Sequence, residues 1–355
     1  MNRSSLVRLL FTCLALASVA PGATPPAQPL RPKVVVVTTF EIGADTGDRP
    51  GEFQFWAERE QLAGSIAVPG LDHPVRFNER GVFGVVSGTT VRAGLQMLAL
   101  GLDPRFDFSR TYWLVNGIAG VNPEIASEGS AAWARYVIDG DIAYEIDARE
   151  APADWPYAIM ALGNKTPKEQ PVIPDWAPKP MAWALNPGLV AWAFGLTRSV
   201  ELADSPEAQA HRALYTTFPE ALKPPQVLLG ESFASCRYWH GAAMNRWAMD
   251  WTRLYTKGDG VMTMTNMEDH GIAHALSRLE QLGKIDFQRV LFLRTGSNFS
   301  MPPAGESAAE SMVAEYAGML PALEAAYRVG SPVVHALMAD WPRYEATLPA
   351  PASSN

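Results

Sequence analysis

The amino-acid sequence predicts an α/β fold in which helices flank a central mixed or parallel β-sheet, and two patterns support this prediction. Short runs of apolar and β-branched residues, the clearest at residues 34–40, are typical of strands buried on both faces of a sheet. Between these runs lie segments in which apolar residues recur every three to four positions, as they do on one face of a helix. Strands that alternate with helices in this way favour a sheet covered by helices.

The expected elements follow one another along the chain without an internal repeat. We expect strands at residues 34–40, 82–87, 111–116, 133–138, 142–146, 227–230, 261–265 and 290–295. We expect helices at residues 91–100, 187–200, 207–216, 243–254, 269–282 and 307–327. Residues 151–187 interrupt this order because they are rich in proline and tryptophan, and we expect them to form an extended excursion on the surface.

The N-terminus has the layout of a secretory signal peptide. Arg3 and Arg8 precede an apolar stretch at residues 9–20, and small residues that suit a cleavage site lie close by. An uncleaved anchor is the alternative, but the apolar stretch is shorter than the ~20 residues of a membrane span. We therefore expect a periplasmic or secreted protein. The expected segments are a signal peptide at 1–23, a disordered leader at 24–33, one domain at 34–348 and a frayed tail at 349–355.

Composition argues against two classes of partner and against a disulfide. The chain has a formal net charge of −8 and no run rich in lysine and arginine, so we expect no nucleic-acid partner. The apolar stretches beyond residue 23 are too short to cross a bilayer, so we expect no membrane insertion. Removal of the signal peptide would leave Cys236 as the only cysteine, which excludes an intramolecular disulfide.

Polar and glycine-rich segments follow five of the predicted strands, at the edge where open α/β sheets bind ligands. These segments lie at residues 38–43, 87–94, 116–120, 230–234 and 296–298. Glu268 stands out in addition, because it follows a predicted strand just where a helix is expected to start. A carboxylate fixed there can accept hydrogen bonds from two hydroxyl groups of one small ligand, as a ribose 2′,3′-diol requires.

In order along the chain, five short motifs resemble those of the nucleoside phosphorylase/nucleosidase superfamily. The motifs are Asn116-Gly-Ile-Ala-Gly120, Asp139-Gly-Asp-Ile-Ala143, Gly230-Glu-Ser-Phe233, Met267-Glu268 and Ser297-Asn298. Three stretches, at residues 116–123, 133–136 and 266–269, resemble one branch in particular, the purine nucleoside permease family. The resemblance extends over residues 32–348. It implies a three-layer fold with a central mixed sheet between helices, and a purine nucleoside as the ligand.

The resemblance implies a role for each residue of these motifs. Glu268 would bind the 2′- and 3′-hydroxyls of the ribose, and its charge would lie near the cation that develops on the sugar during cleavage. Met267 would pack under the sugar, and Phe233 would stack on the purine. Asn298, beside Ser297, would face N7 and O6 of the base.

The segment at residues 116–120 and the amide of Asn298 have further consequences. Small residues in this segment would let a ligand approach the backbone, and Asn116, Gly117 and Gly120 are therefore candidate binding residues. Many members of the superfamily have an aspartate at the position of Asn298, where it acts as a general acid toward N7. An amide has no transferable proton and only donates a hydrogen bond. Relatives with Asn at this position favour 6-oxopurines, so the resemblance implies inosine or guanosine over adenosine.

Two nucleophiles are compatible with the sequence. Phosphate would need an anion site, for which Ser87, Thr89, Thr90 and Arg92 are the candidates. Water would need a base, for which Glu41 is the candidate. We rank phosphorolysis slightly ahead of hydrolysis. Inorganic phosphate would then be a co-substrate, and we expect no cofactor.

Each candidate residue also has an ordinary structural explanation. Glu268 could be an acidic residue at a helix start, where the helix dipole favours it. Phe233 could belong to the core, and Asn298 could form a turn. His270 and His274 have the spacing of two metal ligands on one helix, but no third ligand is evident in the sequence, so we expect no metal.

Two classes of function remain open at this point. The protein is either an enzyme that cleaves purine nucleosides or a non-catalytic nucleoside-binding protein that supports nucleoside transport, as the family name suggests. Related proteins build their sites across subunit contacts, so a homo-oligomer also remains open.

Overall fold

A twelve-stranded β-sheet organises the computed structural model of the protein, which describes residues 28–167, 174–177 and 179–351. Along its main path the strands are ordered β10-β7-β12-β13-β5-β1-β4-β3-β2, while β14 pairs with β5 and β6, and β6 with β11. The strands are β1 Val34–Thr38, β2 Gly64–Ile66, β3 Val75–Phe77, β4 Val82–Val86, β5 Tyr112–Val121, β6 Ala131–Trp133, β7 Tyr136–Asp139, β8 Ala143–Glu145, β9 Ile159–Ala161, β10 Ala182–Ala184, β11 Val227–Leu229, β12 Glu231–Ala234, β13 Met262–Asn266 and β14 Val290–Phe299.

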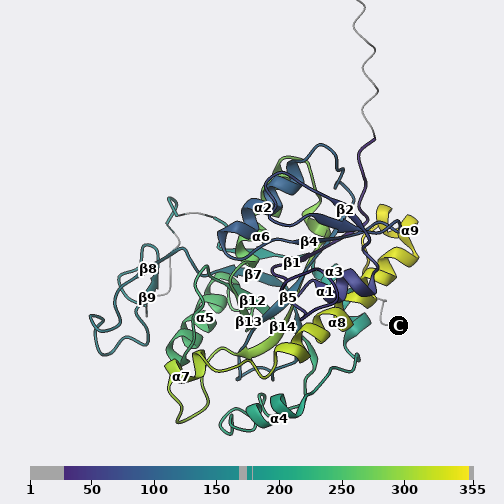
Figure 1. The fold of residues 1–355 in the computed structure, drawn as a ribbon. Coiled ribbons are helices and arrows are strands. Elements are labelled where there is room, and N and C mark those ends of the chain that lie inside the picture. Colours follow the sequence, from purple (N-terminus) through teal and green to yellow (C-terminus); the bar gives the residue numbers. More distant parts are fainter. Residues whose placement is uncertain (1–27, 168–173, 178, 352–355) are drawn as a thin grey trace, which may run out of the picture.

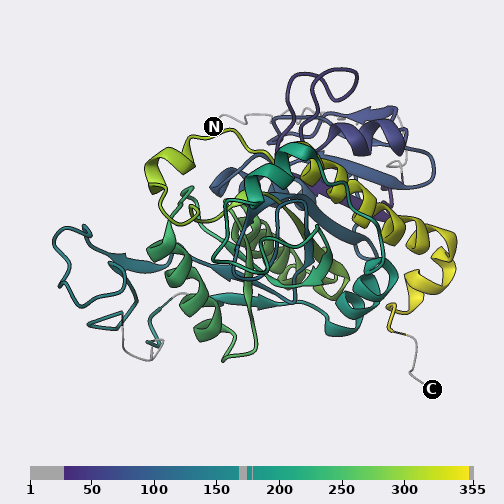
Figure 2. The same ribbon diagram turned by 90° about the horizontal axis from the view of Figure 1, so that it is seen from below.

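Helices cover both faces of this sheet. Helix α2 packs against α6 on one face, and α8 packs against β5 and β14 on the other, with α1 and α3 beside it (Figures 1 and 2). The helices are α1 Gln54–Arg59, α2 Val91–Leu102, α3 Pro187–Thr197, α4 Pro206–Arg212, α5 Ala242–Tyr255, α6 Asp269–Gln281, α7 Ala308–Met312, α8 Met319–Ala339 and α9 Trp341–Ala346, with a 3₁₀ turn at Phe287–Arg289. Parallel pairs such as β1 with β5 coexist with antiparallel pairs such as β13 with β5. The predicted three-layer fold with a mixed sheet is confirmed.

Strands β5 and β14 are longer than the sequence predicts, and this changes the site. We expected strands that end at residues 116 and 295, but each strand has ten residues, and the two pair in parallel from Trp113 with Val290 to Val121 with Phe299. Beyond Val115, where β1 ends its pairing, β14 and then β13 continue to pair with β5. The glycine-rich segments at residues 116–120 and 296–298 are therefore strand rather than turn.

The helix predicted at residues 307–327 is wrong in its bounds. It divides into α7 and α8, and α8 runs on to Ala339 through Pro332. A proline inside a helix removes one backbone hydrogen bond and normally indicates its end. Here the apolar face of α8, with Val329, Val333 and Leu337, is buried against the sheet, and this burial outweighs the local cost.

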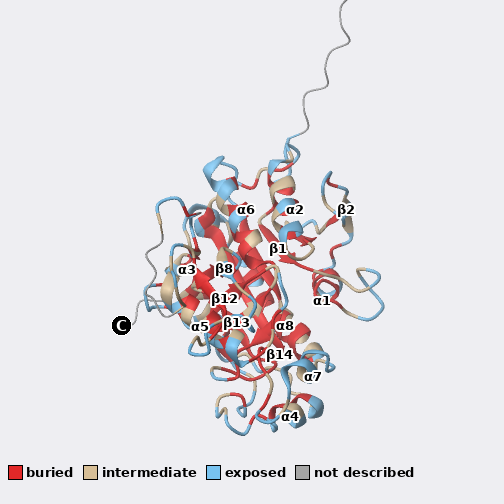
Figure 3. Ribbon diagram, turned by 90° about the vertical axis from the view of Figure 1, so that its left-hand side faces the viewer, coloured by how far each residue is buried: buried red, intermediate tan, exposed pale blue. Residues whose placement is uncertain are grey.

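Burial is concentrated in the central strands, and most exposed residues lie on helix surfaces and loops (Figure 3). Valines of β1, together with residues of β5 and β14, form the centre of the largest core cluster. The two-stranded sheet of β8 and β9 protrudes from the main body (Figures 1 and 2). Between residues 151 and 187, the expected surface excursion, β9 belongs to this protrusion, while β10 returns to the main sheet beside β7.

The terminal predictions lie largely outside the described residues. The signal peptide at 1–23 falls there entirely, as do residues 24–27 of the expected leader and 352–355 of the expected tail. The rest of the leader differs from the expected disorder, because Leu30 bridges to Phe106 and its backbone exchanges hydrogen bonds with residues 105 and 107. Within the described parts of the chain, no helix combines the length and the apolar character that a membrane crossing requires.

Candidate functional site

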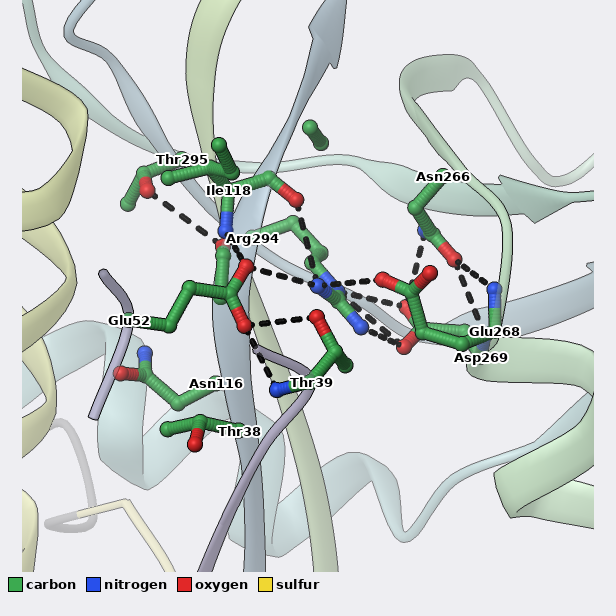
Figure 4. A network of polar contacts seen from close by, with 12 residues as sticks. Thr38, Thr39, Glu52, Asn116, Ile118, Asn266, Glu268, Asp269, Arg294 and Thr295 are labelled. Carbon is green, nitrogen blue, oxygen red and sulfur yellow. Dashed lines mark hydrogen bonds and ion pairs between the residues drawn. The ribbon is translucent and has the colours of Figure 1, made fainter. Parts of the chain in front are cut away.

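A buried arginine gathers three carboxylates at the site, as Figure 4 shows. Arg294, in the middle of β14, extends its guanidinium toward Asp269, Glu268 and Glu52. Its Nη1 is 2.9 Å from Glu268 Oε1 and 3.8 Å from Glu52 Oε1, and Asp269 forms the tightest pair. All four side chains are at most 5% exposed. One positive and three negative groups leave a net charge of −2 when all four are ionised.

Asp269 holds the guanidinium in place. Its carboxylate accepts hydrogen bonds from Arg294 Nε at 3.1 Å, from Ser232 Oγ at 2.6 Å and from Asn266 Nδ2 at 3.0 Å. Arg294 also donates to the carbonyl oxygen of Ile118 at 3.1 Å. Charge-assisted hydrogen bonds of this kind fix both partners in one geometry. Asp269 is thus fully occupied, which leaves Glu268 and Glu52 as the carboxylates with remaining acceptor capacity.

Glu268 occupies the position that the sequence predicts, between β13 and α6. It is the N-cap residue of α6, yet its side chain makes no capping hydrogen bond, so the helix-start explanation does not account for its contacts. One carboxylate oxygen faces Arg294 and the other accepts the backbone N–H of the half-buried Met267 at 3.1 Å. Burial raises the pKa of Glu268 to about 7; Arg294 opposes this rise, while Glu52 and Asp269 add to it.

Glu52 is a site residue that the sequence analysis missed. It lies in the loop before α1, and its carboxylate accepts the backbone N–H and hydroxyl of Thr39 and the backbone N–H of Ile118, each at 2.7 Å. Burial raises its pKa, while Arg294 opposes that rise. Glu52 therefore faces Glu268 across the guanidinium of Arg294.

Glu41, the expected base, has a different task. Its carboxylate accepts the backbone N–H groups of Ile42, Gly51, Phe53 and Gln54, and thereby caps the start of α1. Four amide donors occupy both oxygens. Glu41 therefore shapes the loop that presents Glu52, and its engagement by backbone amides does not agree with the expected role as a base for water.

Gly117 and Gly120 of β5 have no room for a side chain, because residues of the site fill the space beside them. A Cβ atom on Gly117 would lie 2.4 Å from Glu52 Oε1 and 2.5 Å from Arg294 Nη1. A Cβ atom on Gly120 would lie 2.9 Å from Thr265 Cγ2 and 3.5 Å from Asn298 Nδ2. Contacts below 3.0 Å are not tolerated between packed atoms, so Gly117 is a condition for the Arg294 network.

Asn116, an expected binding residue, is hydrogen-bonded to a core tryptophan. Its Oδ1 accepts a hydrogen bond from Trp56 Nε1 at 2.9 Å, and the residue is fully buried. The side chain is therefore engaged in the core beside Gly117, and only its Nδ2 has no partner among the described residues.

Ser297 and Asn298 lie next to Gly120 across the ladder of β14 and β5. Ser297 Oγ donates to Asn298 Oδ1 at 2.9 Å, and Asn298 Nδ2 donates to the hydroxyl of Tyr238 at 3.1 Å. The serine therefore orients the amide so that its N–H groups point toward Tyr238. Asn298 Nδ2 also donates to the backbone carbonyl of Phe299 at 3.1 Å, so both amide hydrogens have partners within the protein.

Another buried acid, Glu128, lies in a small pocket that Asn298 also lines and that the sequence analysis did not anticipate. The pocket is lined by Glu128, His211, Tyr215, His240, Asn298, Phe299, Ser311, Ala314, Glu315 and Tyr316. Glu128 Oε2 is 2.9 Å from His211 Nδ1. Burial raises the pKa of Glu128, and the hydrogen bond to Glu128 raises the pKa of His211. Polar and aromatic groups thus converge beyond the amide of Asn298.

The backbone of the expected anion loop lies beside the first turn of α6. A Cβ atom on Gly271, in the first turn of α6, would lie 3.3 Å from the carbonyl oxygen of Thr90, so residues 87–90 lie against the helix that follows Glu268. Ser87 is buried, its hydroxyl donates to the carbonyl of Gly88, and Thr89 is half-buried. Arg92 is exposed on α2. Among the described residues here, the buried cationic groups are Arg294 and His270, and His270 is paired with Asp141.

Phe233 lies in the core instead of on a ligand surface. It is fully buried, and its ring packs edge-to-face against Trp247 at 4.9 Å and Trp239 at 6.0 Å between ring centroids. Edge-to-face packing satisfies the ring on the inside of the protein. The expected stacking of this ring on a purine does not agree with this placement.

Comparison with known proteins assigns the fold and the family. A sequence profile of the family described as purine nucleoside permease (NUP) matches residues 31–349. The chain is 27% identical to a probable purine nucleoside permease of Schizosaccharomyces pombe over 94% of this chain and 98% of the relative, and 27% identical to a purine nucleoside permease of Candida albicans over 88% and 76%.

Two solved structures are similar in fold. One is a 5′-methylthioadenosine/S-adenosylhomocysteine nucleosidase of Streptococcus pneumoniae, with a TM-score of 0.51 and 14% identity. The other is a 5′-methylthioadenosine/S-adenosylhomocysteine nucleosidase of Helicobacter pylori, with a TM-score of 0.52 and 12% identity. Each similarity covers 86% of this chain and 99% of the other. The central sheet with its flanking helices is thus the nucleosidase fold, and the chain belongs to the purine nucleoside permease family.

Proposed function

We propose that this protein binds purine nucleosides at the Arg294 network and cleaves their N-glycosidic bond with water. The observation that carries the proposal is the placement of two buried glutamates, Glu52 and Glu268, on either side of one guanidinium. Cleavage of such a bond passes through a cationic sugar, as in glycoside hydrolysis. It needs a negative group near the sugar and a base for the attacking water.

Glu268 would accept hydrogen bonds from the 2′- and 3′-hydroxyls and stabilise the developing cation. Its oxygens each make one contact at present, to Arg294 and to the backbone of Met267, and each retains a further lone pair. Arg294 keeps the carboxylate from rotating. Because the ionised form is the one that accepts two hydroxyl hydrogen bonds, the raised pKa of Glu268 predicts better binding above pH 7 than below it.

Glu52 would orient and deprotonate the water. Burial raises its pKa, which makes the carboxylate a stronger base near neutral pH than an exposed glutamate. Three hydrogen bonds from Thr39 and Ile118 hold it in one orientation, which a positioned base requires.

The charge of the network favours water over phosphate. Three carboxylates surround Arg294, so a phosphate dianion at this point would be repelled by a net negative charge in a buried environment. Arg92, the other candidate for a phosphate contact, is exposed. We therefore place hydrolysis ahead of phosphorolysis, and phosphorolysis becomes an alternative outcome of the test.

Asn298 supports a preference for 6-oxopurines. Its amide is oriented by Ser297, and its two N–H groups donate to the Tyr238 hydroxyl and the Phe299 carbonyl. A purine that displaces the Tyr238 hydroxyl would accept the freed N–H at N7 or at O6 of hypoxanthine or guanine. Adenine presents an amino group at position 6, which does not accept a hydrogen bond. The N-terminal segment further suggests that the protein acts in the periplasm or outside the cell.

A second candidate function is nucleoside binding without cleavage, in support of transport. The names of the relatives suggest this role, and the absence of a transferable proton on Asn298 favours it. In this reading Glu268 binds the ribose and Glu52 has no chemical task.

Incubation of the purified protein with inosine, with and without phosphate, tests the proposal. We expect hypoxanthine and ribose in both conditions. Ribose 1-phosphate formed only with phosphate would establish phosphorolysis instead, and saturable inosine binding without hypoxanthine would establish the binding protein. The exposed-surface variant Glu79→Gln controls for the loss of one carboxylate elsewhere and should behave as the unmodified protein.

A further inference from the structure

Three side chains with different donor atoms converge beyond the ends of β7 and β12, next to the first turn of α6. Asp141 follows β7, Cys236 follows β12, and His270 lies in the first turn of α6. His270 Nε2 is 3.1 Å from Asp141 Oδ2 and 3.4 Å from Cys236 Sγ. One oxygen, one sulfur and one nitrogen all lie within 4.8 Å of one another.

These separations are close to the edges of a metal coordination sphere. In a tetrahedral zinc site, bonds of ~2.0–2.1 Å to nitrogen and oxygen and ~2.3 Å to sulfur put neighbouring donor atoms about 3.3–3.6 Å apart. The observed 3.1 and 3.4 Å lie near that range, and the third separation, between the ligand atoms of Asp141 and Cys236, is within 4.8 Å.

The ion pair between His270 and Asp141 accounts for two of the three side chains and leaves the thiol of Cys236 unexplained. Asp141 and Cys236 both address the same ring nitrogen of His270, and that nitrogen carries one hydrogen at most, so it can donate to only one of them. A cation in the centre would satisfy all three donors at once.

The surroundings also suit an ion. The backbone N–H of Cys236 donates to both carboxylate oxygens of Asp141, at 3.0 and 2.9 Å, and the N–H of Asp141 donates to Asp139 at 2.8 Å. These contacts fix the ligands before binding, as outer-shell partners do in metal sites. His270 is buried, Cys236 half-buried and Asp141 exposed, so one side of the cluster opens to solvent.

We propose that Asp141, Cys236 and His270 bind Zn²⁺, with a fourth position open to water or a ligand. A mixture of thiolate, imidazole and carboxylate suits zinc, whereas Mg²⁺ and Ca²⁺ prefer oxygen ligands alone. His270 lies two residues after Glu268, so the bound ion fixes the start of α6 beside the Arg294 network. The site joins three elements that are distant in the sequence.

Metal titration of the purified, chelator-treated protein tests this inference without relying on activity. We expect one Zn²⁺ per chain by calorimetry, and a thiolate-to-cobalt charge-transfer band when Co²⁺ is used as the spectroscopic probe. Cys236→Ser should abolish the band, and Cys236→Ser and His270→Gln should each weaken Zn²⁺ binding by more than about 100-fold, the upper range for loss of an outer-shell partner alone.

His274→Gln is the matched control, because this histidine is exposed one turn further along the same helix. It should leave the band and the affinity unchanged, and circular dichroism should show that all variants fold. Binding that Cys236→Ser and His270→Gln leave intact would mean an adventitious ion only and would overturn the proposal, as would the absence of saturable binding. If Cys236→Ser does not fold, Asp141→Asn takes its place, with the Zn²⁺-dependent rise in Tm expected to disappear.

Discussion

Two places along the central sheet bury a glutamate beside an arginine, and they differ in charge balance. Before β7 and at the start of β12, Glu231 pairs with Arg135 at 2.6 Å and accepts the backbone N–H groups of residues 135 and 136. One buried acid there meets one base, and the exposed Asp259 lies 3.7 Å from the same arginine. Beyond the carboxyl end of β13, Arg294 meets three acids. A balanced pair stabilises a fold, whereas an excess of buried negative charge costs stability and is retained where chemistry needs it.

The most damaging change to the unbalanced network should be Glu52→Gln. An amide cannot accept the proton of the attacking water, so we expect kcat for inosine cleavage to fall about 10³-fold, within the range for a general base, with little change in KM. Steady-state kinetics of hypoxanthine release measure this, and a kcat within threefold of the unmodified enzyme would remove Glu52 from the mechanism.

Glu268→Gln should have the next largest effect. Loss of the charge near the cationic sugar is expected to lower kcat/KM about 10²-fold. Because the change removes one of three carboxylates from around Arg294, the Tm should stay the same or rise. Normal turnover of inosine by this variant would refute the assigned contact with the ribose.

The balanced pair should respond in the opposite way. Arg135→Met leaves Glu231 buried without a counter-charge, and we expect about 2–3 kcal/mol of lost stability, at or below the lower limit for breaking buried pairs because Arg135 is 34% exposed. Denaturant unfolding measures the loss. Inosine cleavage by the folded variant should be unchanged; a large fall in kcat would mean that the two regions are not independent.

The pH dependence sharpens the comparison further. The folded-state pKa of Glu268 is raised from 4.5 to about 7, so the folded protein holds more protons than the unfolded chain between these values, and its contribution to stability falls as pH rises through this window. Activity should do the reverse and fall about tenfold per pH unit below 7. Glu268→Gln should remove its part of both trends, and identical pH profiles of the variant and the parent would contradict this.

The smallest effect is expected at Asn298. Asn298→Asp supplies a proton donor to N7, and the ratio of adenosine to inosine cleavage should rise about tenfold. Competition assays with both nucleosides measure the ratio. An unchanged ratio would separate base selectivity from this side chain, and Ser297→Ala, which frees the amide from its partner, would then identify whether orientation matters.

Much of the site follows from sequence patterns, and the exceptions have physical reasons. The sequence pointed to Glu268, Gly117, Gly120 and Asn298 because small or polar residues follow the predicted strands. The structure places Glu268 and Gly117 beside Arg294, and Gly120 beside Asn298. Glu52 was missed because it lies in an irregular loop, where no periodicity indicates which of two nearby glutamates turns inward. Glu41 is closer to the end of β1, but its carboxylate accepts hydrogen bonds from backbone amides.

Arg294 was also missed, although the sequence contains a signal for it. It follows the apolar residues 290–293 directly within a strand that is buried along its whole length, and a charged side chain there requires buried counter-charges. Phe233 was misplaced because an aromatic residue after a strand looks the same whether it faces a ligand or a core. The lengths of β5 and β14 depend on their pairing with each other, which local sequence does not encode.

The ten-residue pairing of β5 with β14 also affects how a ligand enters and leaves the site. Gly117, Gly120, Arg294 and Asn298 all belong to that ladder, whose amides should be among the last to exchange with heavy water. A nucleoside would therefore bind beside a strand pair that is already rigid. Ligand binding and release would then depend on the loops that carry Glu52 and residues 87–90, and these loops would limit the rates of both steps.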